Sequence, residues 1–216
     1  TLGFSQRSPL KQGCFLDQGK IMLADAGRTV PLIEIGDIQL PGRHNLENVM
    51  ASALAAYALG VSVLRIRASI RTFQGLEHRL EKVLYLQVVD FYNDSKATNV
   101  DSALTSLESF SQGIVLILGG RDKGGNFDML REPVRARVKS IVLMGEAKDK
   151  IFQALRGTVP IETAQTMQTA VRTGFSLASP GDIVILSPAF NSFDKFRSFE
   201  HRVQVLKQEV AALAQE

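Results

Sequence analysis

Apolar and polar residues alternate in two regular ways from about residue 76 onward. Continuous apolar runs such as GIVLILGG and DIVILSP predict strands that are covered on both faces. Longer segments between these runs repeat apolar residues at helical spacing. The predicted strands are 81–85, 88–93, 114–119, 140–144 and 182–187. The predicted helices are 98–110, 127–138, 146–156, 165–178 and 195–213.

This alternation of strands and helices predicts an α/β fold. The expected architecture is a Rossmann-like, mostly parallel sheet with helices on both faces. The segment LYLQVVDFYND indicates a β-hairpin that leads into this sheet. We place a domain boundary near residue 75, so the α/β domain spans 76–216, which is a normal domain size.

The first 75 residues follow a different pattern. Residues 1–40 look β-rich, with a hairpin signal at Asp17, Gln18 and Gly19 and another strand in TVPLIEI. A helical period then begins, for which Asn45 is the predicted N-cap and Gly60 the predicted stop. A second helix is expected after Ser62.

Composition narrows the class of protein. Of 216 residues, 45% are hydrophobic and 22% charged, and no apolar run approaches the roughly 18 residues of a membrane span. The N-terminal residues lack the pattern of a signal peptide, and Cys14 is the only cysteine, so we expect a cytoplasmic protein without membrane contact. A formal charge of +3 without a dense basic block favours anionic small molecules over nucleic acid as partners.

Polar segments follow three of the predicted strands: FYNDSKATN, LGGRDKGGNF and LSPAFNSFDKF. Each alone is typical of a solvated loop. Because ligands of open parallel sheets bind at the carboxyl ends of the strands, the three together favour a site. Lys123 could present a positive charge, although GGRDKGG does not match a phosphate-binding P-loop. Ser192 stands near the predicted start of the last helix, where it could cap the helix or help to bind an anion.

Other chemistry finds little support in the chain. The three histidines are scattered, no metal-binding motif occurs, and no nucleophile has an evident partner, so we assign no catalytic or metal-ligating residue. Asn45 and Asn48, in GRHNLEN, share one helical face, where they could cap the helix or bracket a nucleotide base.

Five motifs, taken in order, resemble the Mur ligase family over nearly the whole chain. They are GRHNLEN, GLEHRLE, NDSKATN, LGGRDKGGNF and SPAFNSFDKFRSFEHR, of which NDSKATN is the most specific. The resemblance implies that residues 1–75 are the β/α tail of a central P-loop-type ATPase domain. It implies that residues 76–216 are the C-terminal, amino-acid-binding domain. The P-loop and the metal ligands of the family are absent from this chain, so the fragment by itself is expected to be inactive.

The resemblance also implies an activity. Members with these motifs are ATP-dependent ligases that add D-glutamate to UDP-N-acetylmuramoyl-L-alanine through an acyl phosphate, in peptidoglycan synthesis. ATP with Mg²⁺ would be the cofactor, with the metal ligands outside this chain, and the protein would be a cytoplasmic monomer.

The implied site has a nucleotide part and a substrate part. The nucleotide would contact Asn45, Asn48, His78, Arg79 and Asp94, the last through the ribose. D-Glutamate and the acyl phosphate would contact Lys96, Thr98, Lys123, Ser192, Phe193 and Phe199. Thr98 and Lys123 would hold one carboxylate of D-glutamate, Ser192 with backbone groups near the two phenylalanines would hold the other, and Lys96 would face the phosphate.

Two alternatives remain open at this point. The chain could be a stand-alone Rossmann-type module that binds a nucleotide or an amino acid without catalysis. It could also be a structural or protein-interaction domain with three merely solvated loops, in which case the strand exits should point in different directions.

Overall fold

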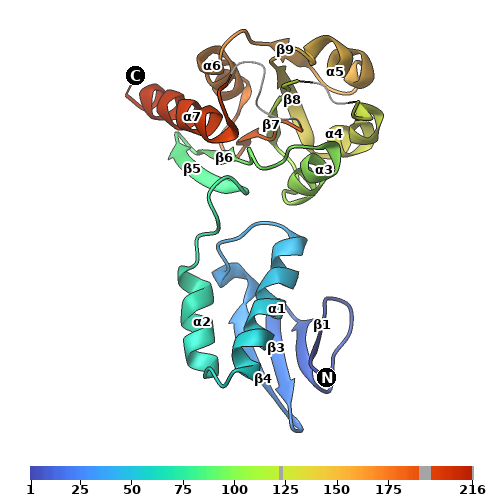
Figure 1. The fold of residues 1–216 in the computed structure, drawn as a ribbon, viewed down its shortest axis with the longest axis vertical. Coiled ribbons are helices and arrows are strands. Elements are labelled where there is room, and N and C mark those ends of the chain that lie inside the picture. The colour runs from blue at the N-terminus through green and yellow to red at the C-terminus, as the bar shows by residue number, and fades with distance from the viewer. Residues whose placement is uncertain (122–123, 190–195, 216) are drawn as a thin grey trace. The chain divides into compact units, whose positions relative to one another are not determined.

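The chain divides into two compact units, Thr1–Gly75 and Leu76–Glu216. The computed structural model describes residues 1–121, 124–189 and 196–215 (Figure 1). Each unit has its own sheet and its own buried core, so each is described by itself.

The first unit is built on a four-stranded sheet. Its strands are β1 (Gly3–Ser5), β2 (Gly13–Asp17), β3 (Lys20–Asp25) and β4 (Arg28–Glu34), in that spatial order. β1 pairs parallel to β2, and the other neighbours pair antiparallel. The predicted hairpin is confirmed, because Gln18 and Gly19 both adopt the positive φ angles that a two-residue turn requires. The short strand β1 was not predicted.

Two helices, α1 (Arg43–Ala58) and α2 (Val63–Thr72), cover this sheet after the short 3₁₀ turn η1 (Ile35–Asp37). The prediction that Asn45 caps α1 is wrong. Gly42 occupies the cap position, and Asn45 lies inside the first turn, where its Nδ2 donates to the carbonyl of Pro41 over 2.7 Å. Glycine was overlooked as a cap because it has no side chain to signal the role. Gly60, with a φ of 84°, ends the helix as predicted.

The second unit contains a six-stranded sheet in the order β5-β6-β10-β7-β8-β9. β5 runs antiparallel to β6, and every other neighbouring pair is parallel. The bounds are β5 (Glu81–Leu86), β6 (Val89–Asn93), β7 (Ile114–Leu118), β8 (Val138–Leu143), β9 (Ile161–Thr163) and β10 (Ile183–Leu186). The predicted hairpin and the mostly parallel sheet are therefore confirmed. The edge strand β9 was missed because only three residues of it pair with β8.

Helices lie on both faces of this sheet, as predicted. They are α3 (Val100–Glu108), α4 (Arg131–Arg137), α5 (Lys148–Leu155), α6 (Met167–Leu177) and α7 (Phe199–Leu213). The predicted helix 127–138 is shorter than expected, since residues Phe127–Leu130 form the 3₁₀ turn η2 and Val138 already belongs to β8. The predicted helix 195–213 is also too long, because α7 begins at Phe199.

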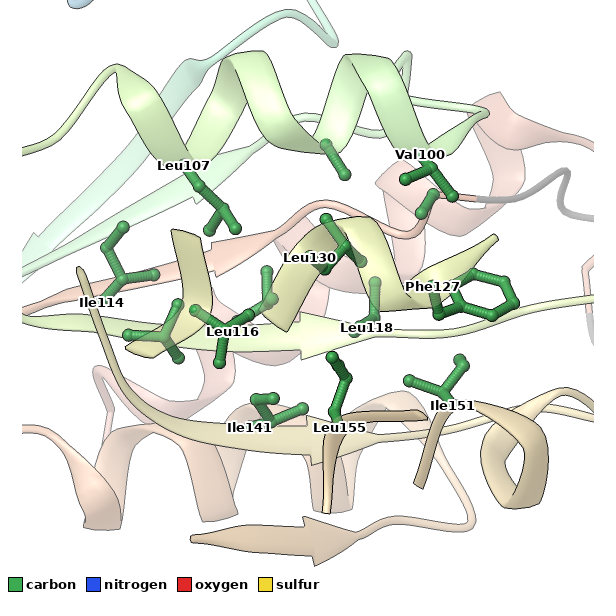
Figure 2. Packing of buried hydrophobic residues seen from close by; sticks show 14 of the residues in the cluster. Val100, Leu107, Ile114, Leu116, Leu118, Phe127, Leu130, Ile141, Ile151 and Leu155 are labelled. Carbon is green, nitrogen blue, oxygen red and sulfur yellow. The ribbon is translucent and has the colours of Figure 1, made fainter. Parts of the chain in front are cut away.

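The core of the second unit consists of two apolar layers, one on each face of the sheet. On one face, Leu116 and Leu118 of β7 pack against Leu107, Leu130 and Ile151 of the helical layer that includes α3 and α5 (Figure 2). On the other face, the alternate residues of β7 pack with α6 and α7. Because both faces of β7 are covered, all five of its side chains are buried, which explains the continuous apolar run in the sequence.

Candidate functional site

The three polar segments begin on neighbouring parallel strands. β6, β10 and β7 are adjacent, so their carboxyl ends lie at one edge of the sheet, here called the carboxyl edge. Hydrogen bonds join them: Asp94 N donates to the carbonyl of Leu186 over 2.8 Å, and Gly119 N donates to that of Pro188 over 3.3 Å. The three exits therefore do not diverge, contrary to what the hypothesis of merely solvated loops requires.

Asp94, the first residue after β6, carries a buried carboxylate, and only 6% of the residue is exposed to solvent. One oxygen accepts from Leu80 N over 3.2 Å, and the other accepts from the hydroxyls of Ser106 and of Ser187, the latter over 3.3 Å. These donors favour the charged form, and nearby Arg79 adds to their effect. Burial nevertheless dominates and raises the pKa of Asp94 to about 6.

The turn before β5 brings His78 beside the loop formed by residues 94–98, here called the loop 94–98. His78 and Leu80 have φ angles of 73° and 44°, which are uncommon for residues other than glycine. Lys96 N donates to the carbonyl of His78 over 3.0 Å, while Asp94 accepts from Leu80 N. The loop thus holds the strained turn in place, and His78, Arg79 and Lys96 belong to one local structure.

Glu81, the first residue of β5, connects this turn to α7. Its Oε2 accepts from His78 N over 3.0 Å and from Asn93 Nδ2 over 2.8 Å, and its Oε1 lies 2.5 Å from Lys207 Nζ. Burial alone would raise the pKa of Glu81, but these donors outweigh it, so that the net shift is downward.

Both backbone polar groups of Ser95, at the centre of the loop, are held by buried side chains. Asn93 Oδ1 accepts from Ser95 N over 3.1 Å, and Arg202 Nη2 of α7 donates to the carbonyl of Ser95 over 2.8 Å. Asn93 is fully buried and Arg202 is 2% exposed. The loop backbone is consequently fixed, whereas the side chains of Lys96 and Thr98 are exposed at the surface.

The start of α7 corrects one expectation about an anion site. The helix begins at Phe199, four residues later than predicted, and its cap is Ser198, whose hydroxyl accepts from His201 N over 3.2 Å. The free N–H groups of this helix therefore do not follow Ser192 directly. Glu200 in the first turn has a lowered pKa, because of its hydrogen bond with Ser198 and, more weakly, the charges of His78 and Lys96.

The predicted site residues fall into three groups. Lys123, Ser192 and Phe193 lie outside the described residues, as does the side chain of Phe199. Asn45 and Asn48 belong to the first unit, where Asn48 Nδ2 donates to Asn45 Oδ1 over 3.3 Å. Within the second unit, the structure brings together His78, Arg79, Asp94, Lys96 and Thr98.

Several residues around the loop were not predicted. They are Glu81, Asn93, Ser106, Ser187, Arg202 and Lys207. Glu81, Asn93, Ser187 and Arg202 stand inside the motifs quoted above, so position within a motif was the available signal. Ser106 and Lys207 carry no such signal, since helical spacing alone does not show which partner a polar residue meets.

The part of the chain that the structure describes contains neither a metal-binding cluster nor a membrane-spanning helix. Within residues 1–121, 124–189 and 196–215, no three His, Cys, Asp or Glu side chains gather in a group that could hold a metal ion. None of the helices in these ranges combines the length and the apolar character needed to cross a membrane.

An open, mostly parallel sheet with helices on both faces defines a Rossmann-like α/β domain, a class of fold whose ligands bind at the carboxyl ends of the strands. Comparison with family models is more specific: residues 78–190, just over half of the chain, match the model described as "Mur ligase, glutamate ligase domain". The chain therefore belongs to the Mur ligase family.

Curated relatives agree with this assignment. The chain is 46% identical over 97% of its length to UDP-N-acetylmuramoylalanine--D-glutamate ligase of Solibacter usitatus. It is 45% identical, again over 97% of its length, to the protein of the same name from Acidobacterium capsulatum. It spans only 47% and 46% of these relatives, respectively, or slightly less than half.

Solved structures show that the fold is shared more widely. UDP-N-acetylmuramate-alanine ligase from Thermotoga maritima superposes with a TM-score of 0.66 at 12% identity, covering 97% of this chain and 48% of that protein. Folylpolyglutamate synthase from Mycobacterium tuberculosis superposes with a TM-score of 0.60 at 17% identity, covering 89% and 46%. At these identities the likeness concerns the fold alone.

Proposed function

We propose that this chain is the D-glutamate-binding part of an ATP-dependent ligase that adds D-glutamate to UDP-N-acetylmuramoyl-L-alanine. In this proposal residues 1–75 end the central ATPase domain and residues 76–216 form the amino-acid-binding domain. The complete protein works as a cytoplasmic monomer in peptidoglycan synthesis. Mg²⁺ accompanies ATP, and its ligands lie outside this chain.

One observation carries the proposal. The three polar segments leave adjacent parallel strands at the carboxyl edge, in a chain that is 46% identical to a relative named for this activity. Loops that share an edge can contact one small molecule together, as ligands of open parallel sheets require.

The chemistry explains why the loops are polar. An amine of D-glutamate attacks an acyl phosphate, so that an amide forms and phosphate leaves. Catalysis of such a step depends largely on placement and on neutralising charge. We assign one carboxylate of D-glutamate to Thr98 and Lys123. The other is assigned to Ser192 with backbone groups near Phe193 and Phe199.

The nucleotide is assigned to the opposite end of the loop 94–98. Asp94 is proposed to accept a hydrogen bond from the ribose, and His78, Arg79, Asn45 and Asn48 to contact the rest of the nucleotide. A carboxylate offers about four acceptor positions. Three donors already use Asp94, so one position remains for a ribose hydroxyl. Lys96, which is exposed, is proposed to face the phosphate groups.

Kinetics of a full-length ligase that contains this chain test the proposal. Thr98→Val removes the hydroxyl and keeps the shape, so we expect the KM for D-glutamate to rise about tenfold, the effect of one lost hydrogen bond to a charged group. Lys123→Met should raise it further, because a full charge is lost. The KM for ATP should change little in both variants.

Thr105→Val is the matched control, since Thr105 is exposed on α3 and its hydroxyl donates only to the carbonyl of Asp101 among the contacts observed. Unchanged KM values for D-glutamate in both Thr98→Val and Lys123→Met would show that the site is assigned wrongly. The chain without the rest of the ligase is expected to form no amide. Titration with ADP and D-glutamate would reveal whether it still binds either ligand, as a stand-alone binding module would.

A further inference from the structure

One helix contacts the loop 94–98 of the proposed amino-acid site. α7, which begins at Phe199, reaches this loop through Arg202. Arg202 Nη2 donates to the carbonyl of Ser95 over 2.8 Å, across 107 residues of sequence. Arg202 is not among the residues predicted from the sequence.

The burial of Arg202 indicates a role beyond packing. Its guanidinium stays charged at any physiological pH, and only 2% of the residue is exposed. Burying a charge is costly unless hydrogen bonds satisfy it, and apolar residues of similar size often pack with equal or better stability. Among the contacts of Arg202 that the structure describes, the hydrogen bond to the Ser95 carbonyl is the one that ties α7 to the loop 94–98.

A second connection runs from α7 to the other side of the same residue. Lys207 pairs with Glu81, Glu81 accepts from the amide of Asn93, and Asn93 accepts from Ser95 N. The side-chain oxygen and nitrogen of Asn93 are thereby used in one defined orientation. α7 thus restrains Ser95 from its carbonyl directly and from its N–H through two intermediates.

We propose that Arg202 is a positioning residue for the amino-acid substrate. By holding Ser95, it sets the position of Thr98, and with it the contact proposed for one carboxylate of the amino acid. Glu81 and Asn93 assist from the opposite side. This inference rests on the proposed function, because it uses the carboxylate contacts assigned there.

Substitution of Arg202 in the full-length ligase tests this role. Arg202→Met removes every donor and keeps the length of the side chain. We expect it to raise the KM for D-glutamate between about tenfold and a hundredfold, as small misplacements of binding groups do, with little change in the KM for ATP. Arg202→Lys keeps one donor for the Ser95 carbonyl and should recover most of the loss. Gln208→Met, on an exposed position of the same helix, should behave as the unmodified enzyme.

A double-mutant cycle shows whether Arg202 acts through Thr98. In a Thr98→Val background, Arg202→Met should raise the KM for D-glutamate by much less than it does alone, because the contact that it positions is already gone. Fully additive effects would overturn the inference. Equal rises of the KM for D-glutamate and of the KM for ATP in Arg202→Met would also overturn it, since a merely structural role predicts that pattern.

The outcome also separates this inference from the proposed function. If Thr98→Val and Lys123→Met leave the KM for D-glutamate unchanged, the proposed amino-acid site fails. If they raise it while Arg202→Met leaves it unchanged, only the role of Arg202 fails. Should Arg202→Met not fold, Lys207→Met decides, because it removes the second connection of α7 to Ser95. Faster hydrogen exchange at Ser95 N and a raised KM for D-glutamate in this variant would support the role, and unchanged values would overturn it.

Discussion

Two carboxylates at opposite edges of the six-stranded sheet are stabilised in different ways. Asp182 precedes β10 at the amino edge, and its Oδ2 lies 2.7 Å from Lys139 Nζ and accepts from Ser179 N over 2.7 Å. Its side chain remains 16% exposed. Asp94 follows β6 at the carboxyl edge, is more deeply buried, and accepts hydrogen bonds from neutral donors, with Arg79 only a minor influence.

The difference between the two carboxylates shows that a charge at the carboxyl edge costs more folding free energy than a charge at the amino edge. The ion pair between Asp182 and Lys139 lies near solvent, so that water and Lys139 both stabilise the carboxylate. Asp94 lacks such a close cation among its observed hydrogen-bond partners, and the raised pKa records the cost of its charge. Groups with strongly shifted pKa values in buried surroundings are typical of functional sites, which agrees with a ligand site at the carboxyl edge.

The largest expected effect concerns the glycines of the two edges. Gly119, at the carboxyl end of β7, has a φ of 130°, and a Cβ atom there would lie 1.9 Å from the carbonyl oxygen of Met144. Gly119→Ala must therefore move the backbone, and we expect a loss of roughly 4 kcal/mol in the free energy of unfolding. Urea unfolding followed by circular dichroism measures this loss.

Gly181, in the turn at the amino edge, is the matched control. Its φ is 90°, but nothing lies within 4 Å of a Cβ atom there. Gly181→Ala should cost only about 1 to 2 kcal/mol, from the unfavourable φ alone. Equal losses in the two variants would show that the carboxyl edge is packed no more tightly than the amino edge.

The second effect concerns the pH dependence of stability. Because the pKa of Asp94 is raised to about 6 in the folded protein, the folded state holds its proton more tightly than the unfolded state does. The contribution of Asp94 is fully present below pH 4 and is lost as the pH rises toward 6. Asp94→Asn removes this titration. The free energy of unfolding of the variant, relative to that of the unmodified chain, should increase by up to about 3 kcal/mol between pH 4 and pH 7.

Unfolding curves at several pH values between 4 and 7 test this prediction. A constant difference between Asp94→Asn and the unmodified chain would mean that the carboxylate titrates normally. Ser106→Ala removes one hydrogen-bond donor to the charged carboxylate of Asp94, so it should raise the pKa of Asp94 in the folded protein further. The loss of stability with rising pH should then have its midpoint at a higher pH.

The smallest effect belongs to the ion pair of the amino edge. Lys139 is 40% exposed, so Lys139→Met should cost only about 0.5 to 1 kcal/mol at low ionic strength. The loss should shrink in about 1 M salt, where exposed charges are screened within a few ångströms. Unfolding at the two salt concentrations measures both values. A larger, salt-independent loss would indicate that this pair is stabilised like the buried network of the carboxyl edge.

Local patterns in the sequence were sufficient for most of the fold. The apolar run of β7 and the turn at Gln18 and Gly19 were predicted because each depends on neighbouring residues. Boundaries were less accurate where local signals were weak. The start of α7 was placed too early because Ser192 and Ser198 are equally plausible caps, and only the hydrogen bond from His201 N identifies Ser198.

The sequence by itself determined the order of the strands and helices apart from the short strands β1 and β9, the polar character of the three strand exits and the family motifs. All of these depend on residues close together in the chain. Only the tertiary structure decided which exits meet, that Asp94 is buried between Leu80, Ser106 and Ser187, and that Arg202 holds Ser95. The physical reason is that burial and hydrogen-bond partners depend on strand order and helix packing, which bring together residues far apart in sequence.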